Sequence, residues 1–288
     1  NGKPYFGQFL IPRSPGRLFA GDEVEVLERR TPIAIQPATA PRVARLPGAA
    51  ATGTQLGGSR ERTLRCVSVI DETHDVKTFR FVAEPGFDYK PGQFITLLLD
   101  IDGATVRRNY TLSSSPSRPL HVSVTVKRAA GGHVSNWLHD NLRAGDTLRA
   151  LGPNGRFHLG AAGEHRKLLL LSAGSGITPM MSMLRFIADA DLPCDVVFHH
   201  GARGERDISF LHELRALRQQ MPGRLRLSWN LTGAASHPAR LDAGAVHAGR
   251  LDREMMATIA PDIGERITFC CGPAGFRGIA RTVPDDLG

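Results

Sequence analysis

The stretch Lys167-Leu-Leu-Leu-Leu-Ser-Ala-Gly-Ser-Gly-Ile-Thr-Pro179 gives the strongest indication of the fold. Its apolar run has the length of one buried strand, and the glycines after it permit a tight turn into a helix. A pyrophosphate can approach such a turn closely, and Thr178 is placed to cap the helix or bind phosphate. Pro179 suits a first helical turn but differs from the ordinary dinucleotide fingerprint. Gly174, Gly176, Thr178 and Pro179 are therefore candidate dinucleotide-binding residues.

Downstream of this turn, apolar strands alternate with amphipathic helices. The expected strands cover residues 167–171, 195–199, 224–231 and 266–271. The expected helices include residues 179–190 and 208–220. Because this alternation is typical of a parallel sheet wrapped by helices, we predict an α/β nucleotide-binding domain over residues 163–288.

The preceding part of the chain has a different pattern, with short strands separated by Gly and Pro turns. Six strands are expected, at residues 64–70, 76–82, 93–99, 106–112, 121–127 and 147–151. One helix, over residues 134–141, interrupts them. This pattern predicts an antiparallel six-stranded barrel over residues 63–162, so the fold class is α+β with two domains.

The first 62 residues do not fit either domain. Residues 31–62 are rich in Pro, Ala, Gly, Thr and Arg and lack an apolar period, which indicates a linker. Residues 1–30 are too short to form a core of their own. We therefore expect them to be the tail of an upstream domain.

Composition limits the possible functions and locations. The net charge of +8 comes from scattered arginines without interleaved aromatics, so we expect no nucleic-acid partner. No apolar run is long enough to span a membrane. The four cysteines have no zinc-site spacing and the adjacent pair suits no disulfide, so we expect no metal site and a reducing, cytoplasmic compartment.

The sequence Arg108-Asn-Tyr-Thr-Leu-Ser113 ends one of the barrel strands and suggests a flavin site. Alternate residues of a strand face the same way, so Arg108 and Tyr110 can line one side of a site. An aromatic ring, a cation and a hydroxyl group from Thr111 or Ser113 are what a flavin dinucleotide requires. An ordinary half-buried strand with a solvated arginine explains the same residues.

A second flavin-related sequence follows, in which Val126 and Lys127 precede Gly131-Gly-His-Val-Ser135. Glycines that run into a helix start leave backbone N–H groups for phosphate oxygens, and Ser135 adds a side-chain donor. Gly132, His133, Val134 and Ser135 are thus candidate phosphate-binding residues. A simple turn before a helix is the alternative.

The last sequence of this kind is Cys271-Gly272-Pro273, at the carboxyl end of an expected parallel strand. Ligands of parallel sheets bind at this end, so the Cys271 thiol can pack against a nicotinamide ring. Cysteine is also a common buried filler. Arg203 or Arg206 can pair with a nucleotide 2′-phosphate or can be a solvated loop cation, and we favour NADH over NADPH.

Taken in order, these sequences resemble the ferredoxin–NADP reductase superfamily, in particular its oxygenase-reductase and hybrid-cluster-protein reductase branches. The matching motifs lie at residues 90–94, 108–111, 132–135, 152–157, 174–179, 249–252 and 271–273. The resemblance implies that FAD binds the barrel domain and NADH or NADPH the α/β domain. It also implies that Arg108 binds the pyrophosphate, that Tyr110 packs on the flavin and that Thr111 approaches N5. It further implies phosphate contacts from Val134 and Ser135, and nicotinamide contacts from Thr178 and Cys271.

The chain departs from the family pattern at its carboxyl end. Members of the family continue from Cys-Gly-Pro into a helix and one more strand, and this sequence stops before that strand, so we expect a truncation. The Cys-x4-Cys-x2-Cys run of a plant-type [2Fe–2S] domain is not in the sequence, and such a domain is expected to lie beyond it. The segment before the linker is similar to the end of a molybdenum-cofactor sulfurase C-terminal (MOSC) domain.

The resemblance implies hydride transfer from NAD(P)H to FAD, with Tyr110, Thr111 and Cys271 at the reacting rings. Single electrons then pass to an iron–sulfur or haem acceptor, either a domain or a separate protein. Two alternatives remain. One is a flavin reductase or oxidase that reduces a small molecule or O₂, and the other is a non-catalytic redox or nucleotide sensor.

Overall fold

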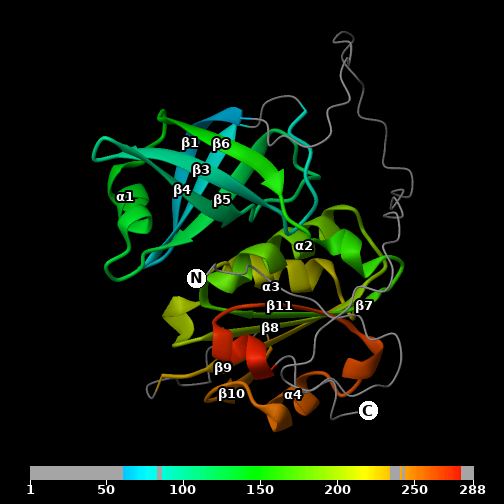
Figure 1. Cartoon of the computed structure of the whole chain (residues 1–288). Helices are drawn as coiled ribbons and strands as arrows, with labels where there is room; N and C mark the ends of the chain where they lie inside the picture. Colours follow the sequence, from blue (N-terminus) through cyan, green and yellow to red (C-terminus); the bar gives the residue numbers. More distant parts are fainter. Residues whose placement is uncertain (1–60, 83–85, 234–240, 242–243, 280–288) are drawn as a thin grey trace, which may run out of the picture.

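The computed structural model describes residues 61–82, 86–233, 241 and 244–279. Figure 1 shows two sheets stacked one above the other, with helix α2 (Ile177–Asp189) between them. The predicted upstream tail and nearly all of the predicted linker lie outside the described residues. Residues 61 and 62, expected to end the linker, instead begin strand β1.

The first sheet is the predicted six-stranded antiparallel barrel. Its strands are β1 (Glu61–Thr73), β2 (Val76–Val82), β3 (Phe94–Ile101), β4 (Ala104–Thr111), β5 (His121–Lys127) and β6 (Thr147–Asn154). They pair in the order β4-β3-β6-β1-β2-β5. An antiparallel bridge between Leu112 and Val124 joins the two outer strands, and the Ser113 N–H donates to the Ser123 carbonyl at 2.8 Å.

Side-chain alternation in β2 and β5 separates the barrel core from its outer face. Phe79, Phe81 and Val124 point into the core, whereas Thr78 and Thr125 point outward. Helix α1 (His133–Asn141) covers one end of the core with its apolar side. The outer face of β2 and β5 is therefore the polar surface that meets the second domain.

The second sheet is parallel, in the order β10-β9-β8-β7-β11. Its strands are β7 (Lys167–Ala173), β8 (Asp195–Ala202), β9 (Leu225–Leu231), β10 (Ala245–Ala248) and β11 (Ile267–Cys271). Helices α2 and α3 (Leu211–Gln220) cover one face, and α4 (Arg253–Ile259) covers the other. Both faces of β7 are buried, which explains why its leucines form a continuous run.

Apart from small shifts of element ends, the structure differs from the predicted elements mainly in the second domain. Helix α3 begins at Leu211 instead of residue 208, because Phe210 adopts a left-handed conformation (φ 62°). Strand β10 was not predicted, since its four residues, Ala-Val-His-Ala, show no apolar period. Helix α4 was also missed, although Asp252 caps it by accepting from the Met255 N–H at 2.8 Å. The residues beyond 279 lie outside the described part.

Two further properties of the described residues concern their thiols and the length of their helices. All four cysteines are free thiols, and burial raises the pKa of Cys66 and Cys194. Among the helices in the described ranges, none combines the length and the apolar character that a membrane crossing needs.

Candidate functional site at the domain junction

The glycine turn after β7 lies against the end of β11. It forms a short 3₁₀ turn over Gly174–Gly176 and leads directly into α2. A Cβ built on Gly176 would lie 2.1 Å from the Cys271 carbonyl oxygen, so only glycine permits this approach. The Thr178 hydroxyl donates to the Ser175 carbonyl at 3.2 Å. The turn and the cysteine, which lie far apart in the sequence, thus form one structure.

Cys271 ends β11 opposite Ser172 of β7. The preceding Cys270 is buried in the cluster beneath α4, so the two adjacent thiols face opposite sides of the sheet. Burial raises the pKa of Cys271 to about 11, which means that the thiol is neutral at physiological pH. Gly272 is partly exposed and Pro273 exposed, and a helical segment begins at residue 274.

Alkylation by iodoacetamide tests the state of Cys271. Because a pKa of about 11 lies two units above the ordinary value of 9.0, we expect its alkylation at pH 8 to be about 100-fold slower than that of a free thiol. The rate should rise with pH up to about 11. Mass spectrometry with fragmentation distinguishes Cys271 from Cys270. A rate equal to that of N-acetylcysteine would contradict the assignment.

The end of β4 carries the predicted flavin residues. Arg108 pairs with Leu97 of β3 and Tyr110 with Ile95, so both side chains lie on one face of the strand. Tyr110 packs against the barrel core, and burial raises its pKa to about 12, so the phenol is neutral below that pH. Arg108 is exposed and Thr111 is partly exposed on the opposite face. The alternation expected from the sequence is present.

Ser113 has a different environment from the one expected. It is fully buried, and its hydroxyl lies 2.9 Å from Thr125 Oγ1 and 3.3 Å from the Ser123 carbonyl oxygen. Thr125 Oγ1 lies 2.7 Å from Thr78 Oγ1. Because this network already uses the Ser113 hydroxyl, Thr111 is the better placed of the two candidates for a ligand contact.

The residues at the end of β5 and the start of α1 form an uncapped helix start, the kind of structure at which anions bind. Helix α1 begins after Gly132 without a side-chain cap, so the first-turn N–H groups of His133, Val134 and Ser135 have no partner within the helix. The Val134 side chain is buried in the barrel core, which leaves only its backbone for a ligand. Ser135 Oγ accepts from the Ala129 N–H at 3.2 Å and so holds the turn before the helix.

Val126 and Lys127 are used within the protein itself. Val126 is buried, and its carbonyl oxygen lies 2.8 Å from Nε2 of the buried His139. The Lys127 ammonium lies 2.7 Å from the Asp75 carboxylate. Burial disfavours the charged form of Asp75, but the hydrogen bonds from Lys127 and Thr73 outweigh it and lower the pKa. A ligand contact by Val126 or Lys127 would have to form alongside the His139 hydrogen bond and the Asp75 ion pair.

Strand β5 passes beside the Gly174–Gly176 turn, so the two domains meet at this turn. Polar contacts from one side of α2 hold this junction. Ser182 Oγ donates to the Ser114 carbonyl at 2.7 Å, and Arg185 donates to the Ser113 carbonyl. No short-range signal identifies these residues, because their partners lie about 70 positions away in the sequence.

Two buried histidines near the carboxyl end of β8 were also missed. His199 lies 2.8 Å from Ser228 Oγ and 3.0 Å from Asn230 Oδ1, and His200 lies 2.9 Å from Ser172 Oγ. Burial lowers the pKa of both rings to about 3, so they are neutral. They link β7, β8 and β9 near the carboxyl edge of the sheet.

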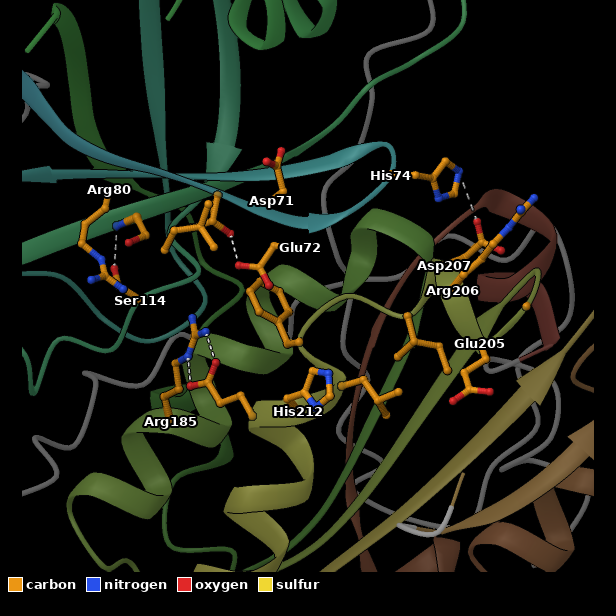
Figure 2. A pocket seen from close by; sticks show the side chains of 18 of the residues that line it. Asp71, Glu72, His74, Arg80, Ser114, Arg185, Glu205, Arg206, Asp207 and His212 are labelled. Atoms are coloured by element: carbon orange, nitrogen blue, oxygen red, sulfur yellow. Dashed lines mark hydrogen bonds and ion pairs between the residues drawn. The ribbon is translucent and has the colours of Figure 1, made fainter. Parts of the chain in front are cut away.

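A groove of about 1690 Å³ opens between the domains (Figure 2). The β1–β2 hairpin forms one wall with Glu72 and His74, and the segment after β8 forms the other. Arg203 and Arg206, either of which could pair with a 2′-phosphate or be a solvated loop cation, both line this groove. Carboxylates lie in the same lining, so the groove has mixed charge. It reaches the carboxyl ends of β8 and β9, where parallel sheets bind ligands.

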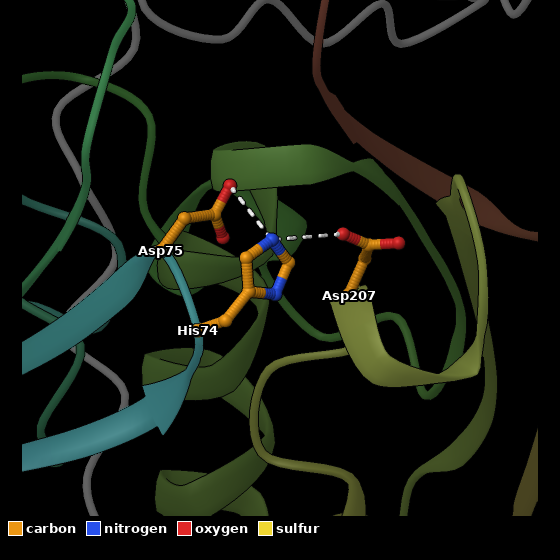
Figure 3. A group of neighbouring side chains, drawn as sticks. All are labelled: His74, Asp75 and Asp207. Atoms are coloured by element: carbon orange, nitrogen blue, oxygen red, sulfur yellow. Dashed lines mark ion pairs between the residues drawn. The ribbon is translucent and has the colours of Figure 1, made fainter.

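Three side chains converge at one end of the groove (Figure 3). His74 Nε2 lies 3.9 Å from an Asp75 oxygen and 3.8 Å from an Asp207 oxygen, across the domain boundary. These residue types can ligate a cation. However, Lys127 already neutralises Asp75, and half of the His74 side chain is exposed. We therefore describe the cluster as a contact between domains and assign no metal to it.

These features fit a flavin dinucleotide and a nicotinamide dinucleotide. An uncapped helix start near an exposed arginine suits a pyrophosphate, and the partly buried Tyr110 offers an aromatic surface. The family models agree with this division. Residues 63–159 match the oxidoreductase FAD-binding domain, and residues 170–282 match the oxidoreductase NAD-binding domain. The chain is an FAD-binding domain joined to an NAD-binding domain of the ferredoxin–NADP reductase type.

Several of the relatives are named as reductase components of monooxygenases. The glycine betaine monooxygenase reductase subunit of Pseudomonas aeruginosa is 45% identical over 225 residues, which cover 77% of this chain and 60% of the relative. The ferredoxin reductase component of 3-ketosteroid-9-alpha-monooxygenase from Mycolicibacterium smegmatis is 35% identical over 243 residues, covering 80% and 64%. The chain thus spans about 60% of the length of these relatives.

A solved structure supports the same arrangement of domains. The FAD/NAD-binding domain of nitric oxide dioxygenase from Vibrio cholerae matches with a TM-score of 0.68 and 25% identity. The match covers 79% of this chain and 93% of that domain. The MOSC-like tail predicted for residues 1–30 lies outside both family matches and outside the described residues.

Proposed function

We propose that this chain is the flavin and nicotinamide unit of an oxygenase reductase. It takes a hydride from NADH onto bound FAD and passes electrons singly to an iron–sulfur acceptor. FAD supplies the conversion from two-electron to one-electron chemistry, which nicotinamide does not perform. The protein contributes binding, orientation and exclusion of water.

One observation carries this proposal, namely the contact between the β7–α2 turn and the barrel at the domain junction. The glycine turn contacts the end of β11 within one domain, and the same turn lies beside β5 of the other. A dinucleotide bound at the carboxyl edge of the parallel sheet would therefore extend toward the flavin strand β4. Hydride transfer requires the two dinucleotide sites to lie close together, whereas a sensor does not.

The predicted residues have the following proposed roles. Arg108 and the first-turn N–H groups of α1 bind the FAD pyrophosphate. Tyr110 packs on the flavin ring as a neutral phenol, and Thr111 donates toward the ring edge. The dinucleotide is held by residues of the β7–α2 turn and the β11 end, namely Gly174, Gly176, Thr178, Pro179, Cys271, Gly272 and Pro273.

We favour NADH because of the charges in the groove. Glu205 and Asp207 lie in the same lining as Arg203 and Arg206. A 2′-phosphate placed against the arginines would also be repelled by these carboxylates. NADH lacks that phosphate and is not subject to this repulsion.

Anaerobic mixing with each nucleotide tests the function. The chain loaded with FAD should lose its oxidised-flavin colour on addition of NADH, and more slowly with NADPH. Transfer to a plant-type [2Fe–2S] protein should then be faster than reduction of O₂. A flavin that neither nucleotide reduces would reject the proposal. Preferential reduction of O₂ would favour the flavin-oxidase alternative.

Replacement of Cys271 tests the predicted nicotinamide contact. In Cys271→Ala we expect flavin reduction by NADH to be about 100-fold slower, because the ring loses the surface that holds it in line with the flavin. Stopped-flow absorbance measures this rate. Cys194→Ala is the matched control, since it removes a buried thiol from the same domain at a distance from the turn. Equal rates in wild type and Cys271→Ala would remove Cys271 from the mechanism.

We make two further proposals, about the electron acceptor and about residues 1–30. We propose that a [2Fe–2S] domain or protein accepts the electrons, as the relatives' roles in oxygenase systems suggest. We also propose that residues 1–30 come from a MOSC-like domain. Determination of the complete reading frame tests both.

A further inference from the structure

Helix α2 connects the two halves of the proposed reaction site. Its amino end carries the nicotinamide turn, and its side facing the barrel contacts the segment that follows the flavin strand β4. Three residues make these contacts, Ser182, Arg185 and Asp189, at spacings of three and four. Residues at these spacings lie on one side of a helix.

Arg185 is the most deeply buried charged group in this set, with 9% of its surface exposed. Its Nη1 group donates to the Ser113 carbonyl of the barrel domain. Its Nε and Nη2 groups form a two-pronged ion pair with Glu213 of α3, at 2.8 and 2.5 Å. The guanidinium also lies over the Phe210 ring, 4.9 Å from its centre.

The other anchors are weaker or less specific. The Arg118–Asp189 pair has two hydrogen bonds, at 2.9 and 2.7 Å, but half of the Arg118 side chain is exposed. Exposed pairs of this kind stabilise a structure by only about 0–1 kcal/mol. Ser182 is buried but forms neutral bonds to Ser114 and Gly92. Among these residues, only Arg185 connects α2 both to the segment that follows β4 and to helix α3.

We infer that Arg185 is a positioning residue for hydride transfer. Ser113 lies two residues after Thr111, and Arg185 lies two helical turns after Thr178. The Arg185–Ser113 bond therefore sets how far the nicotinamide turn lies from the flavin strand. In the step itself a C–H bond of the nicotinamide breaks, an N–H bond of the flavin forms, and the electron pair moves with the hydrogen. Arg185 exchanges neither protons nor electrons. This inference rests on the proposed function.

Arg185→Lys is the principal test, because a lysine keeps the charge but cannot reproduce the planar fork. In the FAD-loaded chain we expect flavin reduction at saturating NADH to be about 10- to 100-fold slower, since small misplacements have effects of this size. The NADH dissociation constant and the FAD content should stay within threefold. The isotope effect with deuterated NADH should increase. Arg118→Gln breaks the exposed ion pair with Asp189 at the end of the same helix, and its reduction rate should stay within twofold of wild type.

A second measurement does not depend on activity. Hydrogen–deuterium exchange at residues 112–114, which precede the Arg118 contact, should become faster in Arg185→Lys and remain unchanged in Arg118→Gln. If the wild type is not reduced by either nucleotide, the proposed function fails, and this exchange measurement alone decides whether Arg185 fixes the junction.

Glu213→Gln is a second test in case Arg185→Lys does not fold. It leaves Arg185 in place and weakens only the ion pair that orients it. We expect an intermediate decrease in the reduction rate. A wild-type reduction rate in folded Arg185→Lys would overturn the inference. If Arg185→Lys does not fold or does not retain FAD, a wild-type rate in Glu213→Gln overturns it instead.

Discussion

Gly176→Ala should abolish most NADH-dependent flavin reduction and destabilise the NAD-binding domain. The added Cβ would lie 2.1 Å from the Cys271 carbonyl oxygen and 2.9 Å from the Gly272 nitrogen. Both are backbone atoms of β11 and the turn after it, so neither can move aside as a flexible side chain would. The glycine turn must then separate from the Cys-Gly-Pro segment. We expect a loss of at least about 3 kcal/mol in stability and a rate decrease of about 100-fold.

Gly174→Ala is the matched control in the same turn. Gly174 has a φ of 54°, but a Cβ there meets no atom within 4 Å. The expected loss of stability in Gly174→Ala therefore comes only from placing alanine in the left-handed conformation, and amounts to about 1–2 kcal/mol. Urea unfolding gives the stability, and stopped-flow absorbance gives the reduction rate. If both alanine variants behave alike, the close contact between the turn and β11 does not control the site.

Arg266→Met should destabilise the same domain without altering the chemistry. The Arg266 side chain is fully buried at the opposite end of β11. It forms ion pairs at 2.7 Å with Asp195 and Asp262 and donates to the Leu168 carbonyl at 3.2 Å. Methionine keeps most of the apolar volume but leaves these groups without their partner. We expect a loss of about 3 kcal/mol in stability, measured by urea unfolding.

The pH dependence gives a further check on this arginine. Its hydrogen bonds lower the pKa of Asp262 below the ordinary value of 3.8. The Asp262 contribution is thus complete above that ordinary value and is lost as the pH falls through the lowered one. Arg266→Met should show a smaller loss on acidification than wild type. Arg149→Gln, which breaks an exposed pair with Glu61, should change stability by about 0–1 kcal/mol. A similar loss in both variants would contradict the structural role of Arg266.

Local sequence patterns identified both domain folds, because each fold shows in the spacing of apolar and polar residues within single strands and helices. The leucine run of β7 and the glycines after it form one continuous strand–turn–helix, so 13 consecutive residues contained the information. The alternation of Arg108 and Tyr110 on β4 likewise needed only the strand period. Short or irregular elements such as β10 carried no such signal and were missed.

The environment of individual side chains did not follow from these patterns. Ser113 is a plausible ligand by its position after β4, yet the outer strand β5 uses its hydroxyl in a buried network. The pKa of Cys271 depends on burial by segments from several parts of the chain. Burial is a property of packing, so motif spacing does not reveal it.

The sequence by itself determined the order of the two domains and indicated candidate residues for each dinucleotide, because motif spacing and strand periodicity are local. Only the tertiary structure decided how the two sites face each other. That arrangement depends on contacts such as Arg185 with Ser113, which are 72 residues apart, and Gly176 with Cys271. Contacts at such separations depend on the packing of both domains, and they hold the β7–α2 turn against the barrel.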